Sequence, residues 1–155
     1  MTTPGRGGVL VRLARPCDEH ALCGIDPIAV GGDADRRASI RRWCEDGAAS
    51  VAEDEWGAPV GYCVMEYTFF GHGFVAMLMV APSARRRGVG RLLLDAAADS
   101  CTTEKLFTST NVSNRSMLGL LERAGWRPVG LLHGLDEGDP ELFYLDSVAV
   151  ERRTQ

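Results

Sequence analysis

Short apolar runs and amphipathic stripes alternate along the chain, and this pattern predicts a mixed α/β fold. Residues 74–80 are all apolar and of strand length, and Ala81-Pro82 ends the run because proline cannot extend a hydrogen-bonded ladder. We therefore expect a buried strand over residues 74–80. Beyond it, apolar residues recur at helical spacing and predict an amphipathic helix; they are Val89, Leu92, Leu93, Ala96 and Ala97.

The residues before this strand predict three further strands and two helices. Alternation of apolar and other residues favours strands, whereas apolar stripes at i, i+3 and i+4 favour helices. The predicted elements are a strand over 9–15, a helix from Pro16 to Ile25, a second helix that carries Ile40, Trp43 and Cys44 and ends at Gly47, and a hairpin of strands 48–54 and 58–67. Residues 69–73 then lead into the buried strand.

The residues after the amphipathic helix complete the predicted sheet. They predict a strand over 105–110, a helix that Ser113-Asn114 caps and Gly125 ends, and strands over 126–133 and 141–148 around an acidic loop, 134–140. Residues 1–8 are small, polar and glycine-rich, so we expect a disordered lead there and a single domain over residues 9–150.

Composition narrows the class of protein. With 155 residues, 45% apolar and 25% charged, the chain suits one globular domain, and its net charge of −4 argues against a general nucleic-acid binder. The five cysteines form no CxxC pair and are odd in number, so we expect reduced thiols in a cytoplasmic protein and no metal site. No apolar run reaches the length of a membrane span, and we expect no membrane partner.

The junction between the buried strand and the amphipathic helix is the strongest candidate for a binding site. The first turn of a helix leaves backbone N–H groups without intrahelical partners, and Gly88 and Gly90 let an anion approach them closely. Positive charge surrounds them, from Arg85, Arg86, Arg87 and Arg91. A GxxxxGK[ST] motif and the third glycine of a dinucleotide fingerprint are both missing, which leaves a mononucleotide or pantetheine-type cofactor.

These residues carry a resemblance to a known family. The pattern Val80-x-Pro82-x-x-Arg85-x-x-Gly88-x-Gly90 resembles the acyl-CoA motif of the GNAT superfamily of N-acyltransferases, in which [Arg/Gln]-x-x-Gly-x-[Gly/Ala] follows a strand. The resemblance covers nearly the whole chain. It implies a mixed sheet of about seven strands, splayed at its centre and flanked by about four helices.

The resemblance also implies a cofactor and the residues that hold it. The cofactor is acetyl-CoA, used as a co-substrate, and its pyrophosphate lies on the N–H groups of the loop from Arg85 to Arg91, Val89 included. Its pantetheine arm pairs with the backbone of the preceding strand at Leu78, Met79 and Val80.

A second segment, Asn114 to Trp126, resembles another motif of the same family, in which an asparagine touches the pantetheine arm. Asn114 matches that asparagine, and Asn111 is a second candidate whose alternative role is a turn at the end of a strand. Many family members have a tyrosine that protonates the leaving thiolate, but this chain has Leu121 at that position. Another group, or water, must therefore supply the proton.

Two side chains are candidates for the proton transfers. Strand alternation puts Glu66 on an otherwise apolar face, which suits a general base, although a solvated Glu66 at a frayed strand end is the alternative. Tyr144 is the candidate acid, because a phenol placed near a thiolate can donate a proton; a core tyrosine is the alternative. The acids of the loop Asp136 to Glu141 are the next candidates for the base.

The predicted function is therefore transfer of an acetyl group from acetyl-CoA to a primary amine of a small molecule by direct attack. A protein or peptide N-terminal acetyltransferase is one alternative, and a non-catalytic acyl-CoA sensor is another, which Leu121 favours slightly. The expected partner is the small amine, and a homodimer is compatible with this interpretation. The sequence does not identify the amine, since fold analogy does not identify a substrate.

Overall fold

The structure is a computed structural model that describes residues 3–4 and 8–146. The chain divides into two compact units, which are treated separately below. Unit 1 comprises Met1–Met65 and Met77–Ala97, and unit 2 comprises Glu66–Ala76 and Ala98–Gln155. Strand β4 (Pro59–Phe69), strand β5 (His72–Val80) and helix α4 (Val89–Ser100) each contribute residues to both units.

Unit 1 contains the first strands of the sheet, in the order β1-β2-β3-β4-β5. The strands β1 (Thr3–Pro4), β2 (Leu10–Leu13), β3 (Ala49–Glu53) and β4 pair antiparallel, each with the next. Successive residues of β4 face opposite sides of the sheet. Tyr62 and Val64 therefore face one layer of helices, whereas Gly61 faces α4.

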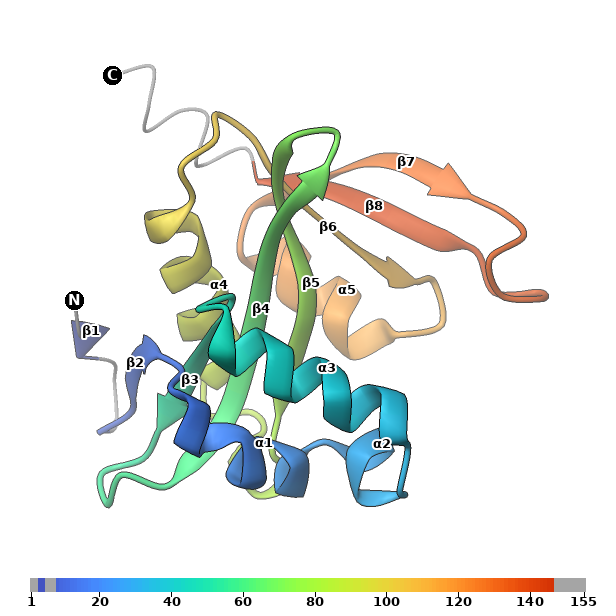
Figure 1. Cartoon of the computed structure of the whole chain (residues 1–155). Coiled ribbons are helices and arrows are strands. Elements are labelled where there is room, and N and C mark those ends of the chain that lie inside the picture. The colour runs from blue at the N-terminus through green and yellow to red at the C-terminus, as the bar shows by residue number, and fades with distance from the viewer. Residues whose placement is uncertain (1–2, 5–7, 147–155) are drawn as a thin grey trace. The chain divides into compact units, whose positions relative to one another are not determined.

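Three helices cover the first of these two faces: α1 (Glu19–Ile25), α2 (Pro27–Val30) and α3 (Ala34–Glu45), with the 3-10 turn η1 (Pro16–Asp18) before them (Figure 1). Their buried side chains form one apolar cluster with the sheet: Ala14, Leu22, Ala29, Ile40, Trp43, Cys44, Ala49, Val51, Tyr62 and Val64. Met77 and Met79 of β5 pack against the same cluster. The apolar stripe predicted for α3, which consists of Ile40, Trp43 and Cys44, thus faces this core.

Helix α4 covers the other face of unit 1, and Gly61 sets how closely it approaches. A Cβ built at Gly61 would lie 2.9 Å from the carbonyl oxygen of Met79 and 3.1 Å from Cγ1 of Val89, the first residue of α4. Cβ atoms do not approach other atoms that closely, so only glycine fits here. Gly61 therefore fixes the start of α4 against β4.

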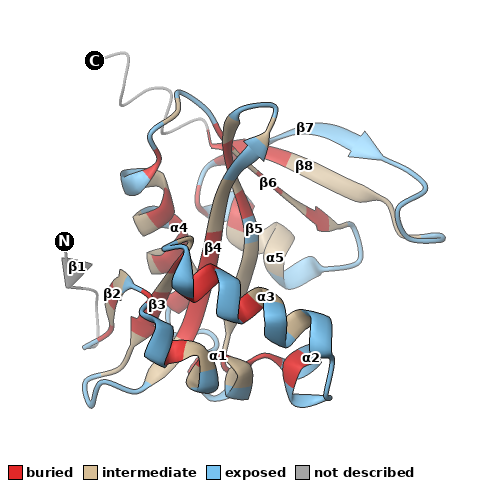
Figure 2. Ribbon diagram, in the orientation of Figure 1, coloured by how far each residue is buried: buried red, intermediate tan, exposed pale blue. Residues whose placement is uncertain are grey.

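Unit 2 contains the other end of the sheet, in the order β4-β5-β6-β8-β7. The strands β6 (Leu106–Asn111), β7 (Trp126–Leu132) and β8 (Glu141–Asp146) are accompanied by helix α5 (Arg115–Arg123). β5 pairs parallel with β6, and β6 and β7 each pair antiparallel with β8. Apart from its first residue, Trp126, β7 is exposed along its length (Figure 2).

The predicted mixed sheet with flanking helices is confirmed, and most elements begin and end within a few residues of their predicted bounds. Eight strands and five α-helices occur in the described residues, because two short elements were not expected. One is α2, a single turn that begins at Pro27 and that the side chain of Asp26 caps by accepting hydrogen bonds from the N–H groups of Ile28 and Ala29. Proline at the first helical position and aspartate before it favour such a start.

The other unexpected element is β1, in the segment predicted to be a disordered lead. Thr3 pairs with Val11 and Pro4 with Leu10, because β2 offers an open edge and proline is tolerated in an edge strand. The remaining residues of the predicted lead, except Gly8, lie outside the described part of the chain, as do the last two of the predicted strand 141–148. None of the helices described is long and apolar enough to cross a membrane.

The link between β4 and β5 is shorter than the five residues expected. β4 continues to Phe69 and β5 begins at His72, so only Phe70 and Gly71 connect them, with φ angles of 51° and 77°. Two positive φ angles are typical of the tight turns whose twist suits a hairpin. His72, expected in a turn, is the first residue of β5.

Candidate functional site

The segment between β5 and α4 forms the glycine loop that the sequence predicts. After the 3-10 turn η2 (Pro82–Ala84), the backbone enters the left-handed region twice, at Arg86 (φ 62°) and Gly88 (φ 78°). The first bond of the following helix runs from the N–H of Leu92 to the carbonyl of Gly88, at 3.1 Å. The N–H groups of Val89 and Gly90 precede it and therefore lie at the N-terminal end of α4, where no intrahelical acceptor exists.

The space beside Gly88 is open. A Cβ built at Gly88 would have no protein atom of the described residues within 4 Å, and the buried side chain of Val89 anchors the helix directly behind it. The guanidinium of Arg85 approaches the carbonyl of Val80 at 3.4 Å, and that of Arg91 pairs with Asp95 at 3.2 Å. The four loop arginines are exposed. The loop thus combines positive charge, a helix N-terminus and unfilled space, which together fit a phosphate group.

The strand before the loop is less buried than its apolar sequence suggested. Gly73 and Val75 are buried, whereas Leu78, Met79 and Val80 are only half-buried. The parallel register with β6 joins residues 73–75 to residues 106–108. The predicted strand over 74–80 is present, but the prediction that it is buried holds only for Val75, since Ala76 is exposed and the other residues of the run are half-buried. An apolar run does not reveal how much of each side chain its neighbours cover.

The two asparagines predicted to contact the cofactor arm already have protein partners in unit 2. The side-chain amide of Asn111 donates to Asp136 at 2.8 Å and to the carbonyl of Asp139 at 3.2 Å. Asn114 is the N-cap of α5, and its side-chain oxygen accepts from the N–H of Met117 at 3.2 Å. Cofactor contacts by either residue remain predictions, with the amide nitrogen of Asn114 available for one.

The acidic loop between β7 and β8 holds the turn between β6 and α5. Besides the bond to Asn111, Asp139 accepts from the N–H of Ser113 at 3.1 Å and from its hydroxyl at 2.5 Å. Two of the acids considered as alternative bases, Asp136 and Asp139, are therefore engaged in structural hydrogen bonds.

Leu121 and Tyr144 are both buried, but only Tyr144 carries a polar group that could donate a proton. The side chain of Leu121 is fully buried, so a residue at this position faces the core. Tyr144 lies opposite Thr108, the residue whose hydroxyl donates to the carbonyl of Val75. Only 2% of Tyr144 is exposed, and its hydroxyl forms no hydrogen bond with a residue in the described part of the chain. Since no fully buried polar atom there lacks a partner, the hydroxyl oxygen must be the part of the side chain that stays accessible. Burial, and to a smaller extent the charge of Glu122, raises the pKa of Tyr144.

Glu66 lies in β4, half-buried, at the boundary where the strand passes into unit 2. Three residues further along β4, Phe69 belongs to an aromatic cluster of unit 2, in which its ring centroid lies 4.8–5.7 Å from those of Phe74, Phe107 and Phe143. Glu66 itself takes part in an interaction within the protein. Its role as a base stays a prediction.

Sequence reasoning missed a buried polar cluster in unit 1, centred on Asp26. This carboxylate is completely buried, and it accepts from the hydroxyl of Tyr62 at 2.5 Å, from Arg36 at 2.8 Å and from the N–H groups that it caps in α2. Burial would raise the pKa of Asp26, but these hydrogen bonds outweigh burial and lower it. The Asp26-Pro27 pair marked the helix start, whereas Arg36 and Tyr62 are too distant in sequence to have been linked to it.

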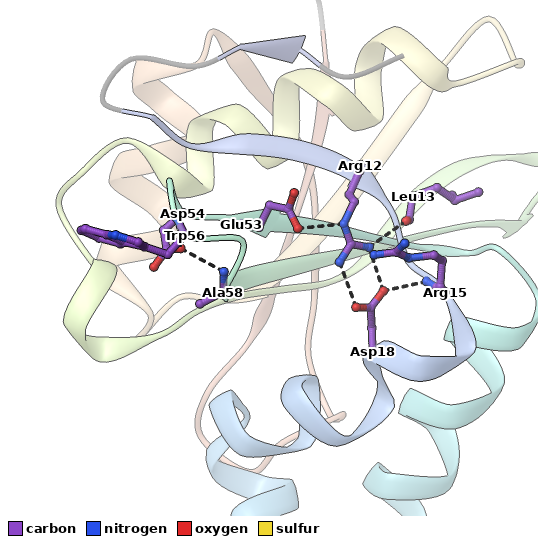
Figure 3. A network of polar contacts seen from close by, with 8 residues as sticks. All are labelled: Arg12, Leu13, Arg15, Asp18, Glu53, Asp54, Trp56 and Ala58. Carbon is purple, nitrogen blue, oxygen red and sulfur yellow. Dashed lines mark hydrogen bonds and ion pairs between the residues drawn. The ribbon is translucent and has the colours of Figure 1, made fainter.

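Two further arginines of α3 have partners in the neighbouring helices. Arg37 donates to the carbonyl of Ala29 and Arg41 pairs with Glu19. Figure 3 shows a comparable ion pair outside α3, in which Arg12 bonds Glu53 through Nε and Asp18 through both terminal nitrogens. Every nitrogen of the Arg12 guanidinium therefore has a partner, as expected of a structural arginine.

The described residues contain no group of three or more histidine, cysteine, aspartate or glutamate side chains that could hold a metal ion. The five cysteines are free thiols, and burial raises the pKa of Cys44 to about 11 and that of Cys63 to about 12. Those two thiols therefore stay protonated near neutral pH, and neither is an activated nucleophile.

Comparison with known proteins shows the family to which this chain belongs. Residues 16–126 match the family model described as "Acetyltransferase (GNAT) family". A crystal structure of a GNAT family acetyltransferase from Bacillus cereus is 32% identical, with a TM-score of 0.83, over 90% of this chain and 96% of that one. No curated protein matches the sequence.

Two more distant structures show the same fold with ligands bound. The acetyltransferase yncA from Salmonella typhimurium, with acetyl-CoA, is 20% identical, with a TM-score of 0.70, over 89% of this chain and 92% of that one. The diaminobutyrate acetyltransferase of Paenibacillus lautus, with L-2,4-diaminobutyric acid and coenzyme A, is 18% identical, with a TM-score of 0.69, over 89% of this chain and 95% of that one.

Proposed function

Because the chain belongs to the GNAT family of acetyltransferases, which use acetyl-CoA, we propose that it acetylates a primary amine of a small molecule. The observation that carries the proposal is the loop at the start of α4, where left-handed backbone at Arg86 and Gly88 precedes the N–H groups of Val89 and Gly90. In the proposed complex these groups bind the pyrophosphate of acetyl-CoA. The exposed loop arginines add charge-assisted contacts to it.

The pantetheine arm would then extend along β5. Leu78, Met79 and Val80 directly precede the loop and are half-buried, so their backbone and side chains are partly accessible to a ligand. An extended arm that lies beside a strand can bond the strand's backbone groups as another strand would. In unit 2, the amide nitrogen of Asn114 is the group we assign to the same arm, whereas Asn111 would have to exchange its bonds to Asp136 and to the carbonyl of Asp139.

The reaction forms a bond between the amine nitrogen and the acetyl carbon and breaks the bond between that carbon and the thioester sulfur. The amine loses a proton and the leaving thiolate gains one. An alkylammonium group has a pKa near that of lysine, about 10.4, so roughly one molecule in a thousand is neutral near pH 7.4. We assign proton removal to Glu66, directly or through water, since this residue is half-buried in β4.

We assign protonation of the thiolate to Tyr144. Its hydroxyl has no partner among the described residues, and a phenol, whose ordinary pKa is about 10, is protonated near neutral pH, as a proton donor requires. Because leucine has no ionisable proton, no acid acts from position 121. The proposed donor thus comes from β8 instead of α5.

The test compares two conservative variants with the wild type, using release of free thiol from acetyl-CoA with an amine substrate. We expect Glu66→Gln to lower kcat/KM by about 10² to 10⁴ near neutral pH and to recover much of it at high pH, where the amine deprotonates unaided. We expect Tyr144→Phe to lower kcat at all pH values at which the wild-type phenol is protonated. Glu104→Gln, at an exposed site in unit 2, is the control and should match the wild type.

An unchanged pH–rate profile for Glu66→Gln would remove Glu66 from the mechanism, and an unchanged kcat for Tyr144→Phe would remove Tyr144. If no amine in a broad panel releases thiol although CoA binds, the acyl-CoA sensor replaces the enzyme as the function. If only peptides with a free N-terminus react, the protein N-terminal acetyltransferase replaces the small-molecule enzyme.

A further inference from the structure

Arg36 is held in place through one edge of its guanidinium and leaves the other edge without a protein partner. Its Nη1 donates to the buried carboxylate of Asp26 at 2.8 Å and lies 3.9 Å from the sulfur of Met77. Burial would lower the pKa of Arg36, but Asp26 and the nearby Tyr62 hydroxyl raise it. Nε and Nη2 form no hydrogen bond of normal geometry with a residue in the described part of the chain, and neither is a fully buried atom that lacks a partner. These two nitrogens therefore reach accessible space, and together they form the side-on fork that matches a carboxylate.

Comparison with Arg12 shows that this arrangement is unusual for a structural ion pair in the same unit. The side chains of Arg12 and Arg36 are equally exposed, at 19% each. All three nitrogens of Arg12 bond protein groups, whereas one nitrogen of Arg36 does. Burial alone thus does not explain why two nitrogens of Arg36 lack partners.

Asp26 does not need Arg36 for its own hydrogen bonds. Its two oxygens already accept from Ile28, Ala29 and Tyr62, at 2.9, 3.2 and 2.5 Å. The carboxylate therefore acts as a rigid anchor that fixes the guanidinium, and holding a planar fork in advance reduces the entropy lost when an anion binds.

Arg36 belongs to α3, but its contact with Met77 shows which part of β5 it lies beside. Met77 precedes Val80 by three residues, or about 10 Å along a strand. The pyrophosphate loop follows Val80, so Met77 lies beyond residues 78–80, the part of β5 assigned to the pantetheine arm, on the side remote from the loop. In the proposed complex the thioester is at the end of the pantetheine arm that is remote from the pyrophosphate. Arg36, beside Met77, therefore lies toward the thioester end of the arm.

We propose that Arg36 binds a carboxylate of the acceptor, so that the substrate is a small amino carboxylate. This inference rests on the proposed function and specifies its substrate class. A single guanidinium, part of whose charge Asp26 offsets, suits a monoanion better than a phosphate dianion. The amine at the other end of the same molecule then attacks the thioester.

The first test needs only the wild-type protein. Amino carboxylates with increasing distance between amine and carboxylate are compared with their carboxamides, which keep the amine and remove the charge. We expect the best carboxylate to exceed its carboxamide in kcat/KM by about 10- to 100-fold, the range for hydrogen bonds to a charged group. Equal or better rates with the carboxamides, or a stronger preference for aminoalkylphosphonates, would overturn the proposal.

The second test uses Arg36→Lys, which keeps a cation beside Asp26 but removes the fork, and Arg12→Lys as the matched control. We expect the ratio of carboxylate to carboxamide rates to fall about 10-fold or more in Arg36→Lys and to stay at the wild-type value in Arg12→Lys. A ratio that Arg36→Lys leaves intact would contradict the proposal. Thermal stabilisation by CoA is measured in the same samples. If CoA does not stabilise the wild-type protein, the proposed function itself is refuted.

Discussion

The loop glycine offers a perturbation whose cost and control can both be worked from the structure. Gly88→Ala adds a methyl group that would meet no protein atom within 4 Å, at a backbone φ of 78°. Gly57, in the turn between β3 and β4, has a φ of 79° and the same open surroundings. An L-residue in this region costs about 1 to 2 kcal/mol, so both alanine variants should lose similar stability without ligand.

Ligand binding should separate the two variants. At a CoA concentration about a hundredfold above its Kd, binding stabilises the wild type by about 2.7 kcal/mol, which raises Tm by about 5 to 11 °C for a chain of this size. Gly57→Ala should show the same increase. In Gly88→Ala the methyl group occupies the space assigned to the phosphate, and a tenfold weaker Kd would reduce the stabilisation to about 1.4 kcal/mol at the same concentration.

The assay is a thermal melt of the three proteins with and without CoA, repeated as a titration to obtain Kd. Similar melting temperatures of the two variants without ligand establish that strain is matched. A full CoA-induced increase in Gly88→Ala would refute the assignment of the phosphate to this loop. Loss of the increase in Gly57→Ala as well would show that backbone strain, and not the occupied space, is responsible.

Two further substitutions test the scaffold that holds the site. Asp26→Asn should reduce the free energy of unfolding by about 3 kcal/mol near neutral pH, because Arg36 loses its partner. Since the folded-state pKa of Asp26 is lowered, its contribution to the free energy of unfolding is present above about pH 4 and disappears as the pH falls through the folded-state pKa. The free energies of unfolding of Asp26→Asn and the wild type, measured with urea, should therefore converge at low pH. Gly61→Ala should displace the start of α4, cost about 1 to 3 kcal/mol and weaken CoA binding, whereas Gly24→Ala in α1, which would contact nothing within 4 Å, should do neither. Normal CoA affinity in Gly61→Ala would contradict the claim that this glycine positions the loop.

The parts of this protein that could be predicted from sequence are those that depend on local patterns. The glycine loop was found because Gly88, the neighbouring arginines and the helix behind them are contiguous in sequence. The apolar stripe containing Leu93 and Ala97 placed α4 correctly, since both residues are buried in the structure. Such features depend on helix period and backbone freedom, which a single sequence displays.

The parts that could not be predicted depend on contacts between distant residues. Asp26 and Arg36 meet Tyr62 across the core, and no local pattern joins them. Asn111 and Asn114 looked alike in sequence, but tertiary contacts bind Asn111 to the acidic loop while Asn114 caps α5. Side-chain partners of this kind follow from how the elements pack and not from their order.

The central claim is that this protein transfers acetyl from acetyl-CoA to a small amine. The most direct measurement incubates the purified protein with acetyl-CoA and one amine at a time, and follows both the free thiol and the mass of the amine. We expect thiol and acetylated amine to appear in equal amounts, with a rate that falls sharply in Gly88→Ala and not in Gly57→Ala. Thiol release without an acetylated amine, or no release with any amine while CoA stabilises the protein, would contradict the claim.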